Sequence, residues 1–161
     1  MKAELPTRPE LLFRPDAFFL KPWTGWGVLR DIRGRTVDRF ECHGQAEASS
    51  RSATSSVTYL YETGRMEELV WNIVSDDEDH YFANELRGGV EGRGRPVGRD
   101  FRWVFQVPMP GRYSKLLSMT AVATYTLLSP STAMGVTEFR LFGVTLQTMT
   151  AFFQHNVEAA A

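Results

Sequence analysis

Glu138 and Arg140 are the pair of charged side chains in the sequence whose spacing could most readily serve a ligand, and they lie within the segment MGVTEFRLFG. Alternate residues of a β-strand point to the same side, so the pair shares one face of the expected strand and Phe139 takes the other. If Phe139 faces the interior, the two charges form an exposed ion pair of small energetic value. If Phe142 and Gly143 form a bulge that reverses the faces, Arg140 could hold the carboxylate of a ligand.

Acid–base chemistry has three candidates in the sequence. They are Glu138, Tyr61 and Glu85, the last of which stands beside the glycine-rich turn RGG and could face inward or outward. A barrel enzyme of the isomerase or cyclase type would need few such groups, because binding itself orients a flexible apolar substrate. No nucleophile paired with a base accompanies them, so catalytic residues stay unassigned.

Histidine and cysteine spacing gives no sign of a metal centre. His43, His80 and His155 lie in different expected strands, and none has a second ligand at the spacing of a zinc or haem site. His43 shares a strand face with Arg39 and Glu41, which indicates the solvated side. We therefore expect no metal and no cofactor.

These candidates must be positioned by β-strands. Runs rich in Val, Thr, Tyr, Phe and Trp alternate with turn residues, which is typical of consecutive antiparallel strands. Nine strands are expected, the last of them interrupted: Trp26–Ile32, Thr36–Ala46, Ser55–Thr63, Met66–Ser75, His80–Leu86, Val90–Val97, Phe101–Val107, Lys115–Leu128 and Met134–Phe153. The turns between them include the acidic SDDED at 75–79 and PMPG at 108–111.

An open sheet of this size would leave two edges, and closure removes them. The sequence thus predicts an all-β fold, a closed antiparallel up-and-down barrel of about 8–10 strands with a Pro-rich N-terminal lead-in. The glycines of GGVEGRGRPVG (88–98) would mark bends or bulges in a strand, and Gly25 and Gly27 a bend around Trp26. GWG has no helix after it, so a phosphate loop is not expected.

Strand parity indicates which aromatic side chains would face the lumen. The residues expected there are Trp26, Tyr61, Trp71 and Trp103, joined by Glu138 and Arg140 if their strand is reversed. Large rings on the inner faces could simply fill the barrel. Alternatively, they could line a pocket for an apolar small molecule.

The composition bounds the remaining possibilities. A length of 161 residues fits one domain, here an extended or short-helical segment over 1–22, a barrel over 23–156 and a disordered tail over 157–161. The net charge of −1 gives no general attraction to nucleic acid, so the Arg-Gly repeats do not indicate an RNA-binding segment. The lone cysteine and the lack of a visible signal peptide or transmembrane segment favour the cytoplasm.

Several short motifs are similar to those of a known family. GWGVLRDIRGR…RF, YLYETG with LVWNI, YFANELRGGVEGRGR and FRWVFQV, between Phe19 and Phe153, closely resemble domain-of-unknown-function family 3833. Members of this group of small bacterial proteins are often described as lipoproteins. The resemblance implies a lipocalin-type, calycin-like barrel, in a family commonly associated with lipid-modifying enzymes. The chain departs from the family pattern at SMTAVATYTLL (118–128) and lacks the lipobox cysteine, which argues against a membrane anchor.

The sequence therefore favours a barrel that binds or carries a small hydrophobic molecule, such as a fatty acid or related lipid. An isomerase-type or cyclase-type barrel enzyme and a structural barrel without ligand are the alternatives. A homodimer is compatible with the sequence.

Overall fold

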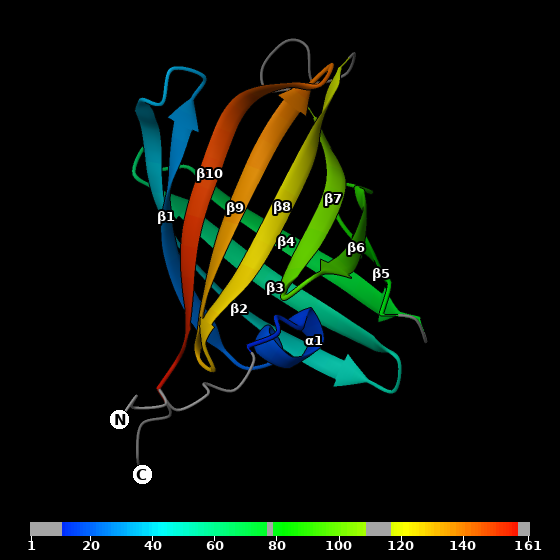
Figure 1. The fold of residues 1–161 in the computed structure, drawn as a ribbon. Coiled ribbons are helices and arrows are strands. Elements are labelled where there is room, and N and C mark those ends of the chain that lie inside the picture. The colour runs from blue at the N-terminus through cyan, green and yellow to red at the C-terminus, as the bar shows by residue number, and fades with distance from the viewer. Residues whose placement is uncertain (1–10, 77–78, 109–116, 158–161) are drawn as a thin grey trace, which may run out of the picture.

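The computed structural model describes residues 11–76, 79–108 and 117–157, which form one short helix and ten strands (Figure 1). The helix is α1 (Pro15–Phe18). The strands are β1 (Trp23–Asp31), β2 (Thr36–Ser49), β3 (Ser52–Tyr61), β4 (Met66–Ser75), β5 (Tyr81–Glu85), β6 (Glu91–Val97), β7 (Asp100–Pro108), β8 (Ser118–Ser129), β9 (Thr132–Leu141) and β10 (Val144–His155).

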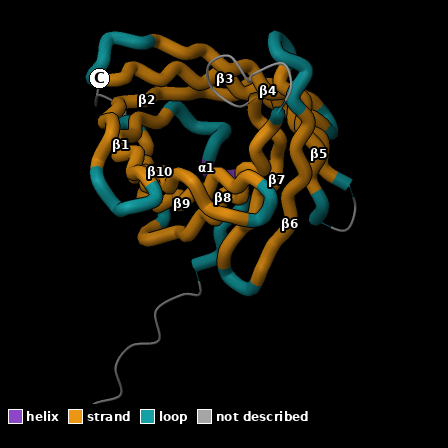
Figure 2. Tube along the Cα trace, turned by 90° about the horizontal axis from the view of Figure 1, so that it is seen from above, coloured by secondary structure: helices purple, strands orange, loops and turns teal. Residues whose placement is uncertain are grey.

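Each strand pairs antiparallel with its neighbour in sequence, and β1 pairs with β10 to close the ring (Figure 2). The structure is an all-β, closed ten-stranded up-and-down barrel, as predicted. Closure leaves no unpaired sheet edge, which explains how so many strands can share one sheet without an exposed edge to aggregate.

The last expected strand is two strands in the structure. Phe142 and Gly143, with φ angles of 50° and 80°, form the two-residue connection between β9 and β10, and Leu141 pairs directly with Val144. Two successive positive φ values suit the twist of a tight β-hairpin. The Phe142-Gly143 pair therefore makes a hairpin and not the bulge considered from sequence.

Several sequence predictions lie wholly or partly outside the described residues. They concern the lead-in before residue 11, the middle of the SDDED turn, the PMPG turn, the start of the eighth strand near Lys115 and most of the C-terminal tail. In the described part, β8 begins at Ser118.

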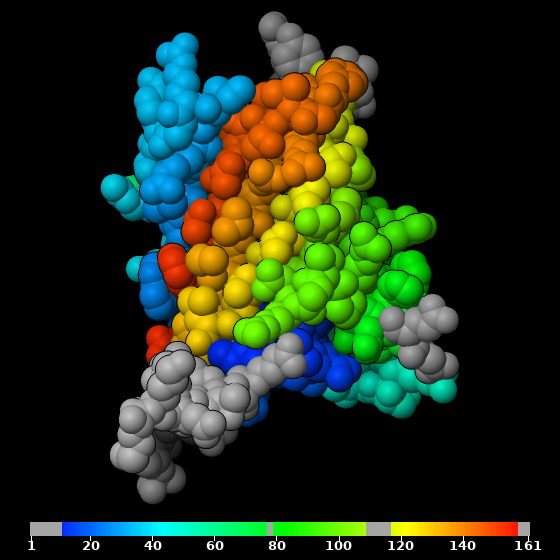
Figure 3. Space-filling model, viewed as in Figure 1, coloured from blue at the N-terminus to red at the C-terminus, as the bar shows by residue number. Residues whose placement is uncertain are grey.

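Helix α1 packs against one end of the barrel, where β1 begins and the β2–β3, β6–β7 and β8–β9 hairpins turn (Figure 3). Pro15 opens the helix, where its missing N–H is no loss. Phe13 and Phe18 are 3% and 4% exposed, and Phe13 N–H donates to the carbonyl of Arg99 at 3.0 Å. His155 Nε2 lies 2.8 Å from the Phe18 carbonyl oxygen. The segment thus closes this end of the lumen with aromatic rings.

Inward-facing glycines provide space for aromatic rings. A Cβ on Gly94 would lie 2.1 Å from Trp103 Cε3, and one on Gly44 would lie 2.4 Å from Trp23 Cζ2. The register of β6 with β7 runs through Gly92 and Gly94 without a shift, so the bulge expected there is wrong. Gly25 and Gly27 likewise make room for side chains of neighbouring strands, such as Phe40, and β1 keeps an unbroken register with β10 through both. Alternating large and small inner side chains let the barrel fill without strain.

Candidate functional site

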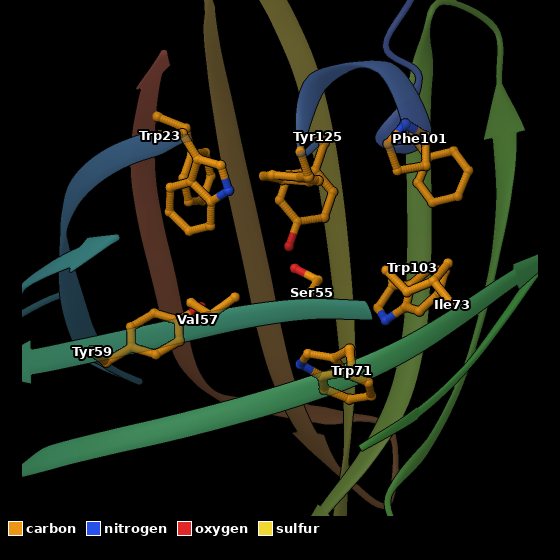
Figure 4. Close-up of a pocket in the computed structure, with 12 residues that line it drawn as sticks. Trp23, Ser55, Val57, Tyr59, Trp71, Ile73, Phe101, Trp103 and Tyr125 are labelled. Carbon is orange, nitrogen blue, oxygen red and sulfur yellow. The ribbon is translucent and has the colours of Figure 1, made fainter. Parts of the chain in front are cut away.

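The lumen contains a partly open cavity of about 100 Å³ directly against α1 (Figure 4). Strands on opposite sides of the barrel contribute its walls, and Pro15 and Phe19 contribute from the N-terminal segment. Eight of its twelve lining residues are aromatic. The lining consists of Pro15, Phe19, Trp23, Ser55, Val57, Tyr59, Trp71, Ile73, Phe101, Trp103, Tyr125 and Phe153.

The aromatic rings support one another around this cavity. Trp23 stands edge-on to Phe153 at 5.2 Å between ring centroids, and Phe19 stands edge-on to Tyr125 at 5.5 Å. Phe101, 1% exposed, lies 5.9 Å from Trp103. Edge-to-face geometry at these separations is favourable for aromatic pairs. The walls are therefore packed, and the cavity is a defined gap between rings.

A second hollow of about 170 Å³ adjoins the cavity between α1 and the β2–β3 hairpin. The two share Pro15, Phe19, Ser55 and Ile73 as lining residues. The outer hollow carries several hydroxyl side chains, among them Ser49, Ser50 and Ser52. The two hollows therefore adjoin each other, and Asp16 and Arg51 line the outer one only.

Neutral polar groups point into the aromatic cavity. Trp23 is 2% exposed, and its Nε1 is buried with no hydrogen-bond partner among the described residues. Ser55 is 5% exposed, and the hydroxyl of Tyr125 points toward it in Figure 4. Burial raises the pKa of Tyr125 to about 12 and that of Tyr59 well above its usual value. Both phenols therefore remain protonated near neutral pH and able to donate.

The cavity lining includes no charged side chain. An acid–base mechanism needs a group that exchanges protons near the working pH, and indoles, a serine and high-pKa phenols do not supply one by themselves. The arrangement is thus equipped to bind and orient a molecule by ring contacts and hydrogen bonds. Among the described residues, no three His, Cys, Asp or Glu side chains cluster as metal ligands.

Two of the six residues expected at the lumen, Trp71 and Trp103, line the cavity. They come from β4 and β7, and Trp71 is half-buried against Phe105 with ring centroids 5.8 Å apart. Tyr61 also faces inward and is 8% exposed, but it lies outside the lining of the cavity. Its hydroxyl donates to Glu67 at 3.3 Å, and the Arg65 guanidinium covers its ring at 4.0 Å.

Trp26 lies on the outer face, which corrects its expected place in the lumen. Its side chain is 50% exposed and its ring lies beside that of Phe152, with centroids 6.5 Å apart. The inner positions of β1 belong to Trp23, Gly25 and Gly27. Hydrophobicity favours the face of β1 that carries the larger side chains as the inner one. Packing instead places the small residues inside, because rings from neighbouring strands fill the space.

Glu138 and Arg140 also lie outside the lumen, which corrects their expected place in its lining. They form an ion pair with each other, with 38% and 40% of their side chains exposed. Phe139 lies on the inner side of β9 opposite Ala121 and Gln147. The exposed-pair interpretation is therefore the one the structure has, and Arg140 is not available to a lumen ligand.

Glu85 is 4% exposed but its carboxylate serves the β5–β6 turn. It accepts hydrogen bonds from the backbone N–H groups of Val70 at 3.1 Å, Arg87 at 3.0 Å and Gly88. Burial alone would raise the pKa of Glu85, but these donors outweigh it and hold the pKa below its usual value. A carboxylate so occupied is a structural acceptor and a poor proton acceptor.

Sequence reasoning missed Trp23, Ser55 and Tyr125. The expected first strand begins only at Trp26, although Trp23 shares parity with Gly25 and Gly27. The signal that could have found it is the run W-x-G-x-G, since small residues in phase with a large one mark an inner face that must accommodate rings from elsewhere. Ser55 and Tyr125 carry no comparable local signal.

The family relationship is settled by sequence. Residues 3–155 match a family model described as "Protein of unknown function (DUF3833)". The chain belongs to this family. The chain matches no curated protein.

Solved structures show a shared fold at low sequence identity. The S-type phycobiliprotein lyase CPES from Guillardia theta is 9% identical, with a TM-score of 0.60 over 87% of this chain and 89% of that chain. The protein EF1p2_mFAP2b, solved bound to DFHBI, is 11% identical, with a TM-score of 0.46 over 89% of this chain and 98% of that chain. The DUF3833 chain is a lipocalin-like barrel. In its described part, no helix is long and apolar enough to cross a membrane.

Proposed function

We propose that the DUF3833 protein binds a small, ring-containing and largely apolar molecule in its lumen. The observation that carries the proposal is the cavity itself, whose lining combines eight aromatic side chains with a few neutral polar groups. Ligand sites are commonly mostly apolar concavities with a small number of placed polar atoms. Voids larger than a water molecule are few in protein interiors, so a gap of this size among packed rings is an unusual feature.

The size of the cavity favours a compact ligand over a long acyl chain. Drug-sized ligands occupy sites of about 300–1,000 Å³, whereas a dry apolar cavity of about 150 Å³ is enough for benzene. The inner cavity of about 100 Å³ and the adjoining hollow of about 170 Å³ together suit one or two rings.

The test is saturable binding of neutral aromatic probes. We expect toluene and indole to bind with a one-to-one stoichiometry in calorimetry and to raise the melting temperature, because a ligand that binds only the folded state stabilises it. The fatty-acid alternative is tested in parallel with a fluorescent polyene fatty acid. Saturable fatty-acid binding without aromatic binding would replace the proposed ligand class.

A matched pair of variants places the binding in the lumen. Ser55→Leu adds apolar volume at a buried position of the cavity, and Ser56→Leu adds the same volume on the exposed face of the same strand. We expect the first to abolish binding and the second to leave it unchanged. Equal binding by both variants, or no saturable binding by the unaltered protein, would contradict the proposal.

The finer expectations on context also stay proposals. A homodimer is checked by light scattering coupled to size-exclusion chromatography, and a cytoplasmic location by fractionation of the cells that produce the protein. The lone Cys42, which cannot form a disulfide within the chain, is the sequence feature that motivates the location.

A further inference from the structure

We propose that the lumen ligand presents an uncharged hydrogen-bond acceptor, such as a ketone or ring carbonyl oxygen, to the indole N–H of Trp23. Ser55 and Tyr125 supply further hydroxyl groups in the same cavity. This inference rests on the proposed function and names the chemistry of its ligand.

The Trp23 indole is held in one position. On one side, its ring lies so close to Gly44 that an added Cβ would meet Cζ2 at 2.4 Å and Cε2 at 2.6 Å. On the other, Phe153 and Phe19 contact it with ring centroids at 5.2 Å and 5.5 Å. The N–H therefore cannot swing out to solvent without disturbing three neighbouring elements.

The buried indole nitrogen has no acceptor among the described residues. Buried donors in folded proteins are almost always paired, because an unpaired one loses its bond to water without replacement. Nε1 belongs to a residue that lines the cavity, and in Figure 4 it points toward the side on which Tyr125 lies. The missing acceptor is thus expected inside the cavity.

The electrostatics of the lining select a neutral acceptor. The inner cavity, into which the indole N–H points, has no charged side chain; Asp16 and Arg51 line only the outer hollow. In the inner cavity a carboxylate would therefore lose its hydration without a counter-ion, and a cation would meet a fixed N–H donor. The phenols remain protonated, since burial raises the pKa of Tyr125 to about 12, and they add donors. Flat rings on both sides favour a flat ligand body.

A set of four single-ring probes tests this on the unaltered protein. Acetophenone carries the neutral acceptor, α-methylstyrene has the same shape with a CH₂ group in place of the oxygen, benzoate adds a negative charge, and phenyltrimethylammonium a positive one. We expect acetophenone to bind about tenfold more tightly than α-methylstyrene, the equivalent of about 1.4 kcal/mol. The two ions should bind more weakly than the ketone.

Nuclear magnetic resonance reports the hydrogen bond directly. The protein has four tryptophans, so its ¹H–¹⁵N spectrum has four indole signals, and that of Trp23 is assigned by its loss in Trp23→Phe. Acetophenone should move this signal further downfield than α-methylstyrene does, because both carry the same ring but only the ketone accepts the hydrogen bond. Trp26→Phe, which removes an exposed indole of the same strand, is the control and should keep the tenfold preference. Trp23→Phe should lose it.

The outcomes separate the two proposals. Equal affinity for ketone and alkene, or an unmoved Trp23 signal on ketone binding, overturns the acceptor inference while the binding function stands. Tighter binding of benzoate or of the ammonium also overturns it. If none of the four probes binds, and toluene and indole do not bind either, the proposed function itself has failed and the inference falls with it.

Discussion

The Glu85 carboxylate offers the sharpest test of how the barrel is held together, because its role as a turn acceptor excludes the acid–base role considered from sequence. Glu85→Gln keeps the size and one acceptor oxygen but turns the other into an amide donor. Three backbone N–H groups, those of Val70, Arg87 and Gly88, then share one acceptor oxygen. Hydrogen bonds to a charged acceptor contribute about 1.5–3 kcal/mol each, and a buried unpaired donor costs about 1–3 kcal/mol.

We therefore expect Glu85→Gln to lower the free energy of unfolding by about 2 kcal/mol at pH 7. The pKa of Glu85 lies below its usual value in the folded protein, so the carboxylate's contribution is complete above the ordinary glutamate pKa of about 4.3. This contribution is lost as the pH falls through the folded-state pKa, because Glu85 is then protonated in both the folded and the unfolded state. The difference between the two proteins should shrink between pH 5 and pH 3.

Urea unfolding followed by tryptophan fluorescence at pH 7, 5 and 3 measures these differences. Glu91→Gln is the matched control, because Glu91 is exposed on the neighbouring β6 strand and starts from the same charge. It should change the unfolding free energy by less than about 0.5 kcal/mol. A Glu85→Gln protein as stable as the unaltered one at pH 7, or a gap that widens in acid, would refute the role given to the carboxylate.

Three further predictions test the packing and the outer face. Gly44→Ala should cost about 1–3 kcal/mol in unfolding free energy and change the near-ultraviolet circular dichroism, because the new Cβ would lie 2.4 Å from Trp23 Cζ2; an unchanged spectrum would contradict the contact. Removing the exposed pair by Glu138→Gln or Arg140→Gln should change stability by no more than about 1 kcal/mol and leave probe binding intact. Burial raises the pKa of Cys42 to about 12, so its thiol should resist a disulfide reagent at pH 8 until urea unfolds the chain; rapid labelling of the folded protein would show that the thiol is accessible.

Strand content could be predicted from the sequence because turn residues and alternating side chains are local signals. Arg33-Gly34 and Thr63-Gly64 mark hairpins whose glycines have φ angles of 77° and 87°, values that glycine adopts at little cost. Closure into a barrel followed from the number of strands and the cost of open edges. The exposure of His43 could also be predicted, because Arg39 and Glu41 on the same strand face are charged.

The inner face of β1 could not be predicted from the residues of that strand alone. Hydrophobicity favours Trp26 and Val28 inside, whereas the structure has Gly25 and Gly27 there because neighbouring strands fill that space with rings such as Phe40. A single strand does not reveal the size of its neighbours' side chains. In β9, by contrast, Phe139 took the inner side as its hydrophobicity indicates.

The sequence by itself determined that the chain is all-β, that its turn residues permit ten antiparallel strands, and that it belongs to the DUF3833 family. Only the tertiary structure decided which residues meet in the lumen, since Trp23, Ser55 and Tyr125 come from three strands far apart in sequence. Side-chain volume is balanced across the closed barrel and not along any one strand. That balance left a small gap among the rings and a buried indole N–H without a partner among the described residues, and both features define the ligand we propose.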